Sequence, residues 1–305
     1  MNAKFAAIDI GTNSINLLIT NGNGDTLLRE GHTERLGEQL HKDRILSHDA
    51  MQRALNRVSK YKATIAASGV TSWKVVVTAP GRLASNAEEF ITQLRNEVGG
   101  RVEVATGDRE AELSFRGAVS GESDQNLARC LIDIGGGSTE FAFSVGDVLH
   151  SISIPLGAVT LTDKHLKSDP PRPEDLTNAI GDVNDHLDDV LREIPNIATA
   201  REFIGVAGTM VTLAAVEIGL KEFDATRLQG FVLTRDAAED VFRTLATESL
   251  DQRKLNPGLP PERADVIVGG CCIVVAVMRR LNLQAITVSV RNLLDGVIEE
   301  LRQAQ

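Results

Sequence analysis

The feature that most restricts the fold of this chain is an internal repeat. Residues 9–14 read DIGTNS and residues 133–138 read DIGGGS, 124 positions later. Each copy ends an apolar segment (3–10 and 129–134) and precedes a second one, the pattern of a strand, a tight turn and a hairpin partner. Because self-similarity at a fixed interval indicates repeated structural units, the sequence predicts two duplicated α/β domains that face each other across a cleft.

Predicted strands and helices alternate along both halves, which is typical of α/β domains. In the first half we expect strands at 3–10, 15–20, 73–79 and 101–105 and helices at 48–68, 83–98 and 109–120. In the second half we expect strands at 129–134, 140–145, 148–154, 202–206 and 285–289 and helices at 174–193, 209–219, 236–247, 261–281 and from 292 onward. The polar segment 121–127 (GESDQNL) predicts the boundary, so the domains are assigned to residues 1–125 and 126–305.

Composition and charge exclude several classes of protein. The chain has no run of 18 apolar residues, no signal-peptide pattern and only three cysteines, two of them adjacent. These features favour a cytoplasmic protein without a membrane partner. The net charge is −10, and residues 126–305 carry most of it, with 17 basic and 26 acidic side chains. A duplex-DNA binder usually has a basic surplus, so nucleic acid is not expected as a partner.

The two repeated loops have the composition of anion-binding turns. Small residues let backbone N–H groups approach a ligand, and successive N–H groups form an anion-binding nest. Hydroxyl groups add donors, and the acidic residue that begins each copy suits Mg²⁺. The candidate phosphate-binding residues are Gly11, Thr12, Asn13, Ser14, Gly135, Gly136, Gly137, Ser138 and Thr139. Neither loop matches the GxGxxG or GxxxxGK[ST] fingerprint, and the six histidines show no zinc pattern.

Paired loops of this kind resemble the actin, sugar-kinase and chaperone ATPase superfamily, whose domains have a ribonuclease H-like fold. Within it, the chain resembles the exopolyphosphatase / guanosine pentaphosphate phosphohydrolase (Ppx/GppA) family, as a short two-domain member. The likeness is carried by 9–14 (DIGTNS), 78–86 (TAPGRLASN), 106–113 (TGDREAEL), 133–140 (DIGGGSTE), 156–159 (LGAV), 205–209 (GVAGT) and 263–265 (RAD). Longer members continue into helical C-terminal domains.

The resemblance implies roles for five side chains. Glu110 matches the glutamate that acts as general base on the attacking water. Arg82 would neutralise a phosphoryl oxygen in the transition state, with pairing to an acid as the alternative. Asp133 and Glu140 would hold Mg²⁺, with Mn²⁺ as a second candidate, and Asp9 would join them as the duplicate of Asp133.

Three stretches depart from the family pattern. Arg109 stands where the family often has a first glutamate, Asn16 where it often has an arginine, and residues 289–292 read SVRN instead of GLRE. Outside the motifs, Arg53, Arg57 and Lys60 recur at helical spacing. We expect a solvated helix face there, with a track for a polyanionic chain as the alternative. The loop 205–209 is either a phosphate site at a helix N-terminus or a plain turn.

These features predict an exopolyphosphatase, a Mg²⁺-dependent hydrolase that removes terminal phosphate from inorganic polyphosphate. Phosphoryl transfer to water depends mainly on positioning and charge neutralisation, which the two loops and the acidic side chains supply. Hydrolysis of guanosine pentaphosphate (pppGpp), an alarmone of the stringent response, is the nearest alternative. A non-enzymatic polyphosphate or alarmone sensor is another, and a sugar kinase lacks a recognisable acid for its acceptor hydroxyl. A second copy of the chain, forming a homodimer, is a further candidate partner.

Overall fold

The computed structural model describes residues 3–38, 40–120, 127–146 and 148–304. Its contacts divide the chain into unit 1, made of Met1–Ser120 and Asn292–Gln305, and unit 2, made of Gly121–Arg291. The predicted boundary segment falls almost entirely outside the described residues. Among the described residues, none of the helices combines the length and the apolar character needed to cross a membrane.

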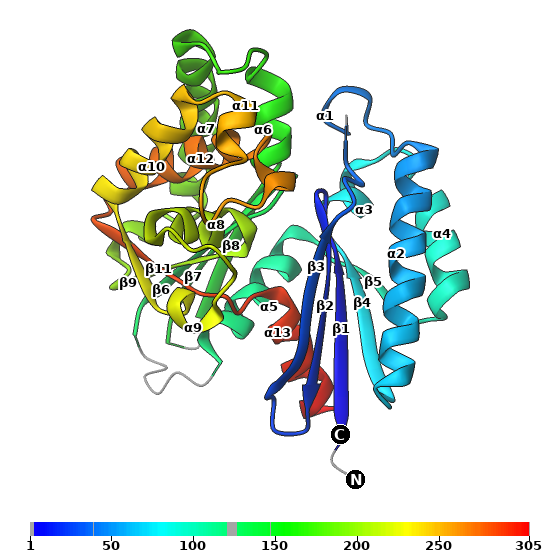
Figure 1. The fold of residues 1–305 in the computed structure, drawn as a ribbon. Helices are drawn as coiled ribbons and strands as arrows, with labels where there is room; N and C mark the ends of the chain where they lie inside the picture. Colours follow the sequence, from blue (N-terminus) through cyan, green and yellow to red (C-terminus); the bar gives the residue numbers. More distant parts are fainter. Residues whose placement is uncertain (1–2, 39, 121–126, 147, 305) are drawn as a thin grey trace. The chain divides into compact units, whose positions relative to one another are not determined.

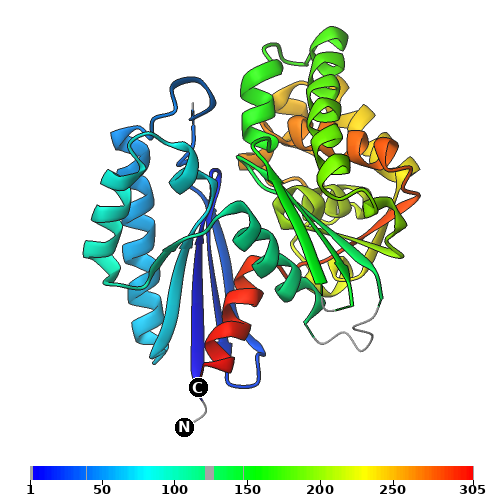
Figure 2. The same ribbon diagram turned by 180° about the vertical axis from the view of Figure 1, so that it is seen from behind.

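Unit 1 is built on a five-stranded sheet in the order β3-β2-β1-β4-β5. Its strands are β1 (Lys4–Ile10), β2 (Ser14–Asn21), β3 (Thr26–Thr33), β4 (Ser72–Val77) and β5 (Val102–Val104). Its helices are α1 (Leu40–Asp43), α2 (His48–Ala67), α3 (Ala79–Leu83), α4 (Ala87–Val98), α5 (Gly107–Val119) and α13 (Leu293–Gln303). Helices α2 and α4 cover one face of the sheet, and α5 and α13 cover the other (Figures 1 and 2).

The two covered faces explain the apolar run of β1. Ile8 and Ile10 point into the core under α2 and α4, whereas Phe5 and Ala7 point into the core under α13. Successive side chains of a strand alternate between faces, so a strand buried on both sides reads as a continuous apolar segment.

Unit 2 repeats this arrangement with one added strand. Its sheet has the order β10-β11-β9-β6-β7-β8. Its strands are β6 (Arg129–Ile134), β7 (Thr139–Val145), β8 (Val148–Ile154), β9 (Glu202–Val206), β10 (Phe231–Thr234) and β11 (Ala285–Val288). Its helices are α6 (Ala158–His165), α7 (Pro173–Glu193), α8 (Ala207–Ile218), α9 (Ala225–Leu228), α10 (Arg235–Thr247), α11 (Leu250–Arg253) and α12 (Ile267–Arg280), with short 3₁₀ turns at Ile197–Thr199 and Pro261–Arg263.

The strand orders confirm the predicted duplication and the α/β fold class. The run β3-β2-β1-β4-β5 corresponds to β8-β7-β6-β9-β11, with a hairpin, a third antiparallel strand and parallel neighbours in the same places. Helix α12 is buried along nearly its whole length and contacts α6, α7, α8 and α10. It begins at Ile267 instead of residue 261, because a 3₁₀ turn occupies the preceding segment.

The last helix corrects the predicted domain limits. Residues 292–305 were assigned to the second domain, but they belong to unit 1. The apolar face of α13, which includes Leu294 and Val297, packs against Phe5 and Ala7 of β1. Helices α5 and α13 also approach backbone to backbone, because glycines at 117 and 296 leave room for it.

We expect Gly117→Ala to destabilise unit 1. The added methyl group would overlap with the carbonyl oxygen of Asn292, and overpacking of this kind lowers the free energy of unfolding by roughly 1–3 kcal/mol. Gly181→Ala is the control, since Gly181 lies in helix α7 with open space around it. That change should raise the stability by about 0.5–1 kcal/mol. Urea denaturation of both variants measures the difference, and equal stabilities would contradict the α5–α13 contact.

Candidate active site

The predicted site residues of unit 1 follow three strands that end at one edge of the sheet. Strands β1, β4 and β5 are parallel neighbours, so their carboxyl ends meet there. Ligands of open α/β sheets bind at this edge. Thr78, which follows β4, brings its backbone N and its Oγ1 within 3.1 and 3.3 Å of the Ile10 carbonyl oxygen. The structure therefore gathers the first loop, the Arg82 segment and the Glu110 segment along this edge.

Glu110 lies in the first turn of α5 and is 7% exposed. Thr106 begins this helix, since its side chain accepts a hydrogen bond from the backbone of Arg109. Arg82, in the last turn of α3, donates from Nη1 to Glu110 Oε2 at 2.6 Å and to the Ala105 carbonyl oxygen at 2.9 Å. The arginine thus pairs with an acid, which was the alternative that the sequence left open. Its role toward a phosphoryl group stays a prediction.

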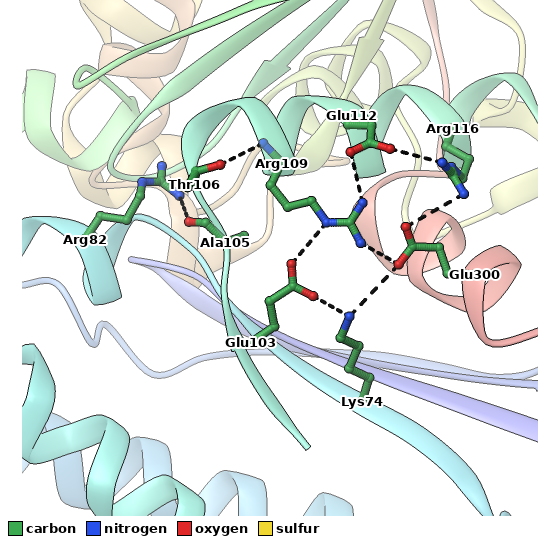
Figure 3. Close-up of polar contacts among 9 residues, drawn as sticks. All are labelled: Lys74, Arg82, Glu103, Ala105, Thr106, Arg109, Glu112, Arg116 and Glu300. Atoms are coloured by element: carbon green, nitrogen blue, oxygen red, sulfur yellow. Dashed lines mark hydrogen bonds and ion pairs between the residues drawn. The ribbon is translucent and has the colours of Figure 1, made fainter. Parts of the chain in front are cut away.

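Arg109, which departs from the family pattern, anchors α5 to its neighbours (Figure 3). Its guanidinium donates to Glu103 of β5 and Glu112 of α5, both at 3.0 Å, and to Glu300 of α13. These contacts engage Arg109 with three carboxylates, while the next residue, Glu110, pairs with Arg82. The substitution therefore leaves the candidate base in place and adds an ionic tie between α5, β5 and α13.

Two members of this ionic cluster, Arg109 and Glu103, are stabilised in their charged forms. The hydrogen bond to Glu300 raises the pKa of the Arg109 guanidinium above its ordinary value. Burial raises the pKa of the Glu103 carboxyl, but hydrogen bonds from Lys74 and Arg109 outweigh burial and leave that pKa below its ordinary value. Since Lys74 also forms an ion pair with Glu103 (Figure 3), β4 is joined to the same cluster.

The first loop contains two buried hydroxyl groups that have no hydrogen-bond partner among the described residues. Gly11 donates to the Ser14 carbonyl oxygen at 3.0 Å and closes the turn. Thr12 Oγ1 and Ser14 Oγ are buried, and neither has a partner among the residues that the structure describes. Buried polar groups are nearly always paired in folded proteins. Phosphate oxygens would accept hydrogen bonds from both hydroxyls, so the loop suits a phosphoryl ligand.

Asn16 is bonded to Asp9, the acid that begins the first copy. The two residues are direct partners in the β1–β2 hairpin, and Asn16 Nδ2 donates to Asp9 Oδ2 at 3.0 Å. Gly31 on β3 leaves room for the amide, since a Cβ atom there would lie 2.6 Å from Asn16 Oδ1. The residue that replaces the family's arginine thus contacts the candidate metal ligand of unit 1.

Unit 2 places Asp133 and Glu140, the two candidate metal ligands, side by side. They are direct partners in the β6–β7 hairpin, at the register that Asp9 and Asn16 occupy in unit 1. Both are buried, and Ser153 of β8 donates to Glu140 Oε1 at 2.7 Å. Sequence reasoning missed Ser153, although the alternation of residues along β8 would have placed it opposite Glu140.

The acidic pair fits a magnesium ion better than it fits a closed metal site. Like charges on directly opposite strand positions destabilise a sheet, so two buried carboxylates there favour a cation or a shared proton. Mg²⁺ typically takes one or two carboxylates and completes its shell with water and substrate phosphate. Among the described residues, no three His, Cys, Asp or Glu side chains are placed to hold a metal. Asp9 belongs to unit 1, so its place in the ligand set stays a prediction.

Gly157, which precedes α6, lets this helix begin directly against the second loop. The carbonyl oxygens of Gly135 and Gly136 accept hydrogen bonds from the backbone of Ala158 and Val159, both at 2.9 Å. Gly157 precedes them, and a Cβ atom there would lie 2.5 Å from the Gly136 carbonyl carbon. These contacts explain the LGAV stretch at 156–159. With their carbonyl groups engaged by α6, the loop's peptide units are fixed in orientation.

The loop 205–209 joins β9 to α8 and contacts Arg263, the arginine of the RAD stretch. Ala207 has a φ of 66°, an uncommon backbone conformation for a residue other than glycine. The Arg263 guanidinium lies against Gly208, where no side chain would fit. Burial lowers the pKa of this guanidinium from its ordinary value. The RAD stretch was the signal that could have identified it.

Comparison with known proteins agrees with this arrangement. A family model described as the Ppx/GppA phosphatase family matches residues 18–304. Exopolyphosphatase 2 of Mycobacterium tuberculosis is 33% identical over 96% of this chain and 97% of its own length. A guanosine-5'-triphosphate,3'-diphosphate pyrophosphatase of Aliivibrio fischeri is 27% identical over 99% of this chain and 61% of its own length.

A solved structure supports the same assignment. The crystal structure of an exopolyphosphatase from Cytophaga hutchinsonii has a TM-score of 0.89 at 27% identity and covers 99% of this chain and 98% of its own. The named relatives are hydrolases of phosphoanhydride bonds, and the predicted two-domain actin-like fold and enzyme class are confirmed. The match along nearly the whole chain, together with a relative of equal extent, shows that this chain belongs to the Ppx/GppA phosphatase family.

Proposed function

We propose that this chain is an exopolyphosphatase that hydrolyses the terminal phosphate of inorganic polyphosphate, with Glu110 as general base. The observation that carries the proposal is the buried Glu110–Arg82 ion pair, at the sheet edge that also holds the first loop. A carboxylate fixed in one orientation can hold an attacking water and accept its proton. The relative that matches this chain over nearly its full length, named exopolyphosphatase 2, supports polyphosphate as the substrate.

The remaining residues bind and neutralise the phosphate chain. The first loop would bind a terminal phosphoryl group through its backbone amides and through the hydroxyls of Thr12 and Ser14, which have no partner among the described residues. The second loop would offer its own amides and hydroxyls to phosphate. Mg²⁺ or Mn²⁺ held by Asp133 and Glu140 would offset the negative charge of the phosphate oxygens. Arg82 keeps Glu110 in place, because its Nη1 donates to Glu110 Oε2 at 2.6 Å.

Hydrolysis of pppGpp by the same site is the second candidate. The pyrophosphatase relative from Aliivibrio fischeri supports it, since that protein is named for guanosine-5'-triphosphate,3'-diphosphate. Both substrates end in a phosphoanhydride that the same base and loops would process. The choice depends on groups that contact the rest of the substrate.

A side-by-side assay of phosphate release tests the proposal. Long polyphosphate, short polyphosphate, pppGpp and ATP are incubated with the protein and Mg²⁺. We expect the highest kcat/KM on polyphosphate and little release from ATP. Short chains should be used at least as well as long ones, because Arg53 and Arg57 pair with acidic side chains and do not form a free basic track. Faster hydrolysis of pppGpp would favour the second candidate, and binding without release would favour a sensor.

A further inference from the structure

The segment Glu34–Glu38, which we call the strap, lies directly on the first loop. The backbone of Glu34 and of Arg35 donates to the Asn13 carbonyl oxygen at 3.0 and 2.8 Å, and Gly37 donates to the Thr12 carbonyl oxygen at 2.8 Å. A side chain at Gly37 would overlap with Thr12. The strap thus occupies the carbonyl side of the loop and contacts it closely.

These hydrogen bonds fix the direction of the loop's amide groups. In a planar trans peptide the C=O and the following N–H point in opposite directions. Because the carbonyl groups of Thr12 and Asn13 point toward the strap, the N–H groups of Asn13 and Ser14 point away from it. The strap therefore holds two adjacent amides on the side of the loop where an anion can approach.

Helix α2 holds the strap through two arginines. Arg57 Nε donates to Glu34 Oε1 at 2.6 Å, and these side chains are only 20% and 13% exposed. Arg53 donates from Nε to the Glu34 carbonyl oxygen at 3.1 Å and from Nη2 to Glu38 Oε1 at 3.0 Å. The expectation of a solvated face is therefore wrong for Arg57. Lys60, one turn further along α2, is exposed.

The strap adopts a strained backbone. Arg35 has a φ of 53°, in the left-handed region that few residues other than glycine occupy. Such a conformation persists where surrounding contacts determine it. Here the contacts on either side are those of Glu34 with α2 and of Gly37 with the first loop. The tie to α2 thus maintains a conformation that the free segment would rarely adopt.

We propose that Arg57 and Arg53 are positioning residues for phosphate binding, and that they act by holding the strap against the first loop. The inference rests on the proposed function, because it assigns the amides of Asn13 and Ser14 to the terminal phosphoryl group. Donors held in place before the substrate arrives need no reorganisation when it binds. Loss of the tie lets the loop's peptide units rotate, and the ground-state affinity for phosphate falls.

Steady-state kinetics on tripolyphosphate test this idea. Arg57→Met should raise KM about tenfold with kcat nearly unchanged, on the scale of one lost hydrogen bond between charged groups. Glu34→Gln should have a similar effect, and the double variant should be no worse than either single variant, since both remove one tie. Lys60→Met, on the same helix and exposed, is the matched control and should leave KM unchanged.

Hydrogen exchange and calorimetry give readouts that do not depend on turnover. Arg57→Met should speed amide exchange at 11–14 and 34–38, leave strand β1 unchanged, and weaken tripolyphosphate binding about tenfold. If the unaltered protein hydrolyses none of the substrates, the proposed function is wrong. Calorimetry of tripolyphosphate binding still tests whether the strap positions the first loop. An unchanged KM and affinity for Arg57→Met and Glu34→Gln would overturn the inference. So would an equal loss in Lys60→Met, or a fall in kcat alone.

Discussion

Replacement of Glu110 by Gln should lower kcat about 10²-fold or more, the usual scale for loss of a general base. The amide keeps the size of the side chain and still accepts a hydrogen bond from Arg82, so the fold should remain intact. Loss of the carboxylate removes the proton acceptor from a buried position that is 7% exposed. Phosphate release at saturating polyphosphate and Mg²⁺ measures the effect.

A control on the same helix distinguishes loss of the general base from loss of any carboxylate on α5. Glu112 lies two residues further along α5, where it pairs with Arg109 and Arg116. Glu112→Gln removes a carboxylate without touching the Glu110–Arg82 pair, so kcat should stay near its original value. Turnover by Glu110→Gln that equals that of Glu112→Gln would exclude Glu110 from the reaction.

Substitutions of Arg82 and of Glu110 should have coupled effects on kcat. Because Arg82 Nη1 lies 2.6 Å from Glu110 Oε2, the two side chains act as a unit. Arg82→Met should also lower kcat, and combining it with Glu110→Gln should cost less than the product of the two single effects. Full additivity would mean that Arg82 serves another part of the site.

Removal of divalent metal should abolish activity. The buried pair of Asp133 and Glu140 is the basis of this expectation, because two opposed carboxylates favour a cation between them. After EDTA treatment and gel filtration we expect no phosphate release. Addition of Mg²⁺ or Mn²⁺ should restore it. A metal-free preparation with full activity would contradict the role of this pair.

Ser153 offers a graded test of the same site. It donates to Glu140 Oε1 at 2.7 Å, and loss of an outer partner typically costs 10–100-fold in metal affinity or activity. Ser153→Ala should therefore raise the Mg²⁺ concentration needed for half-maximal activity by about tenfold. Ser144→Ala is the control, because Ser144 bonds the Gly146 carbonyl oxygen at the far end of β7. An identical Mg²⁺ requirement in both variants would place Ser153 outside the metal site.

Much of the candidate site was predictable because hairpins are local structures. The register that opposes Asp133 to Glu140 follows from a turn of four residues between two strands, Gly135 to Ser138. Once both apolar segments are identified, the length of the turn sets which residues face each other. The pairing of Asp9 with Asn16 follows from the first hairpin in the same way. The two similar hairpins are also the signal by which the duplicated fold was predicted.

Other elements had no recognisable signal in the sequence. Strand β3 was not predicted, because it forms the edge of its sheet and none of its side chains is fully buried. A half-exposed edge strand lacks the apolar run by which buried strands are recognised. The strap that follows it was missed because its contacts join it to the first loop and to α2, which are distant from it in the chain.

Local patterns in the sequence were enough to predict the duplication, the α/β class, and the two loops with the residues that begin and end them, since each depends on neighbours within a few positions. The folded structure was needed to show that α13 belongs to unit 1, that Arg82 pairs with Glu110, and that Arg57 holds the strap. These contacts join residues that are far apart in the chain, 28 positions for Arg82 and Glu110. Such pairs form because packed helices and parallel strands bring them together, and no local pattern of residues encodes that proximity.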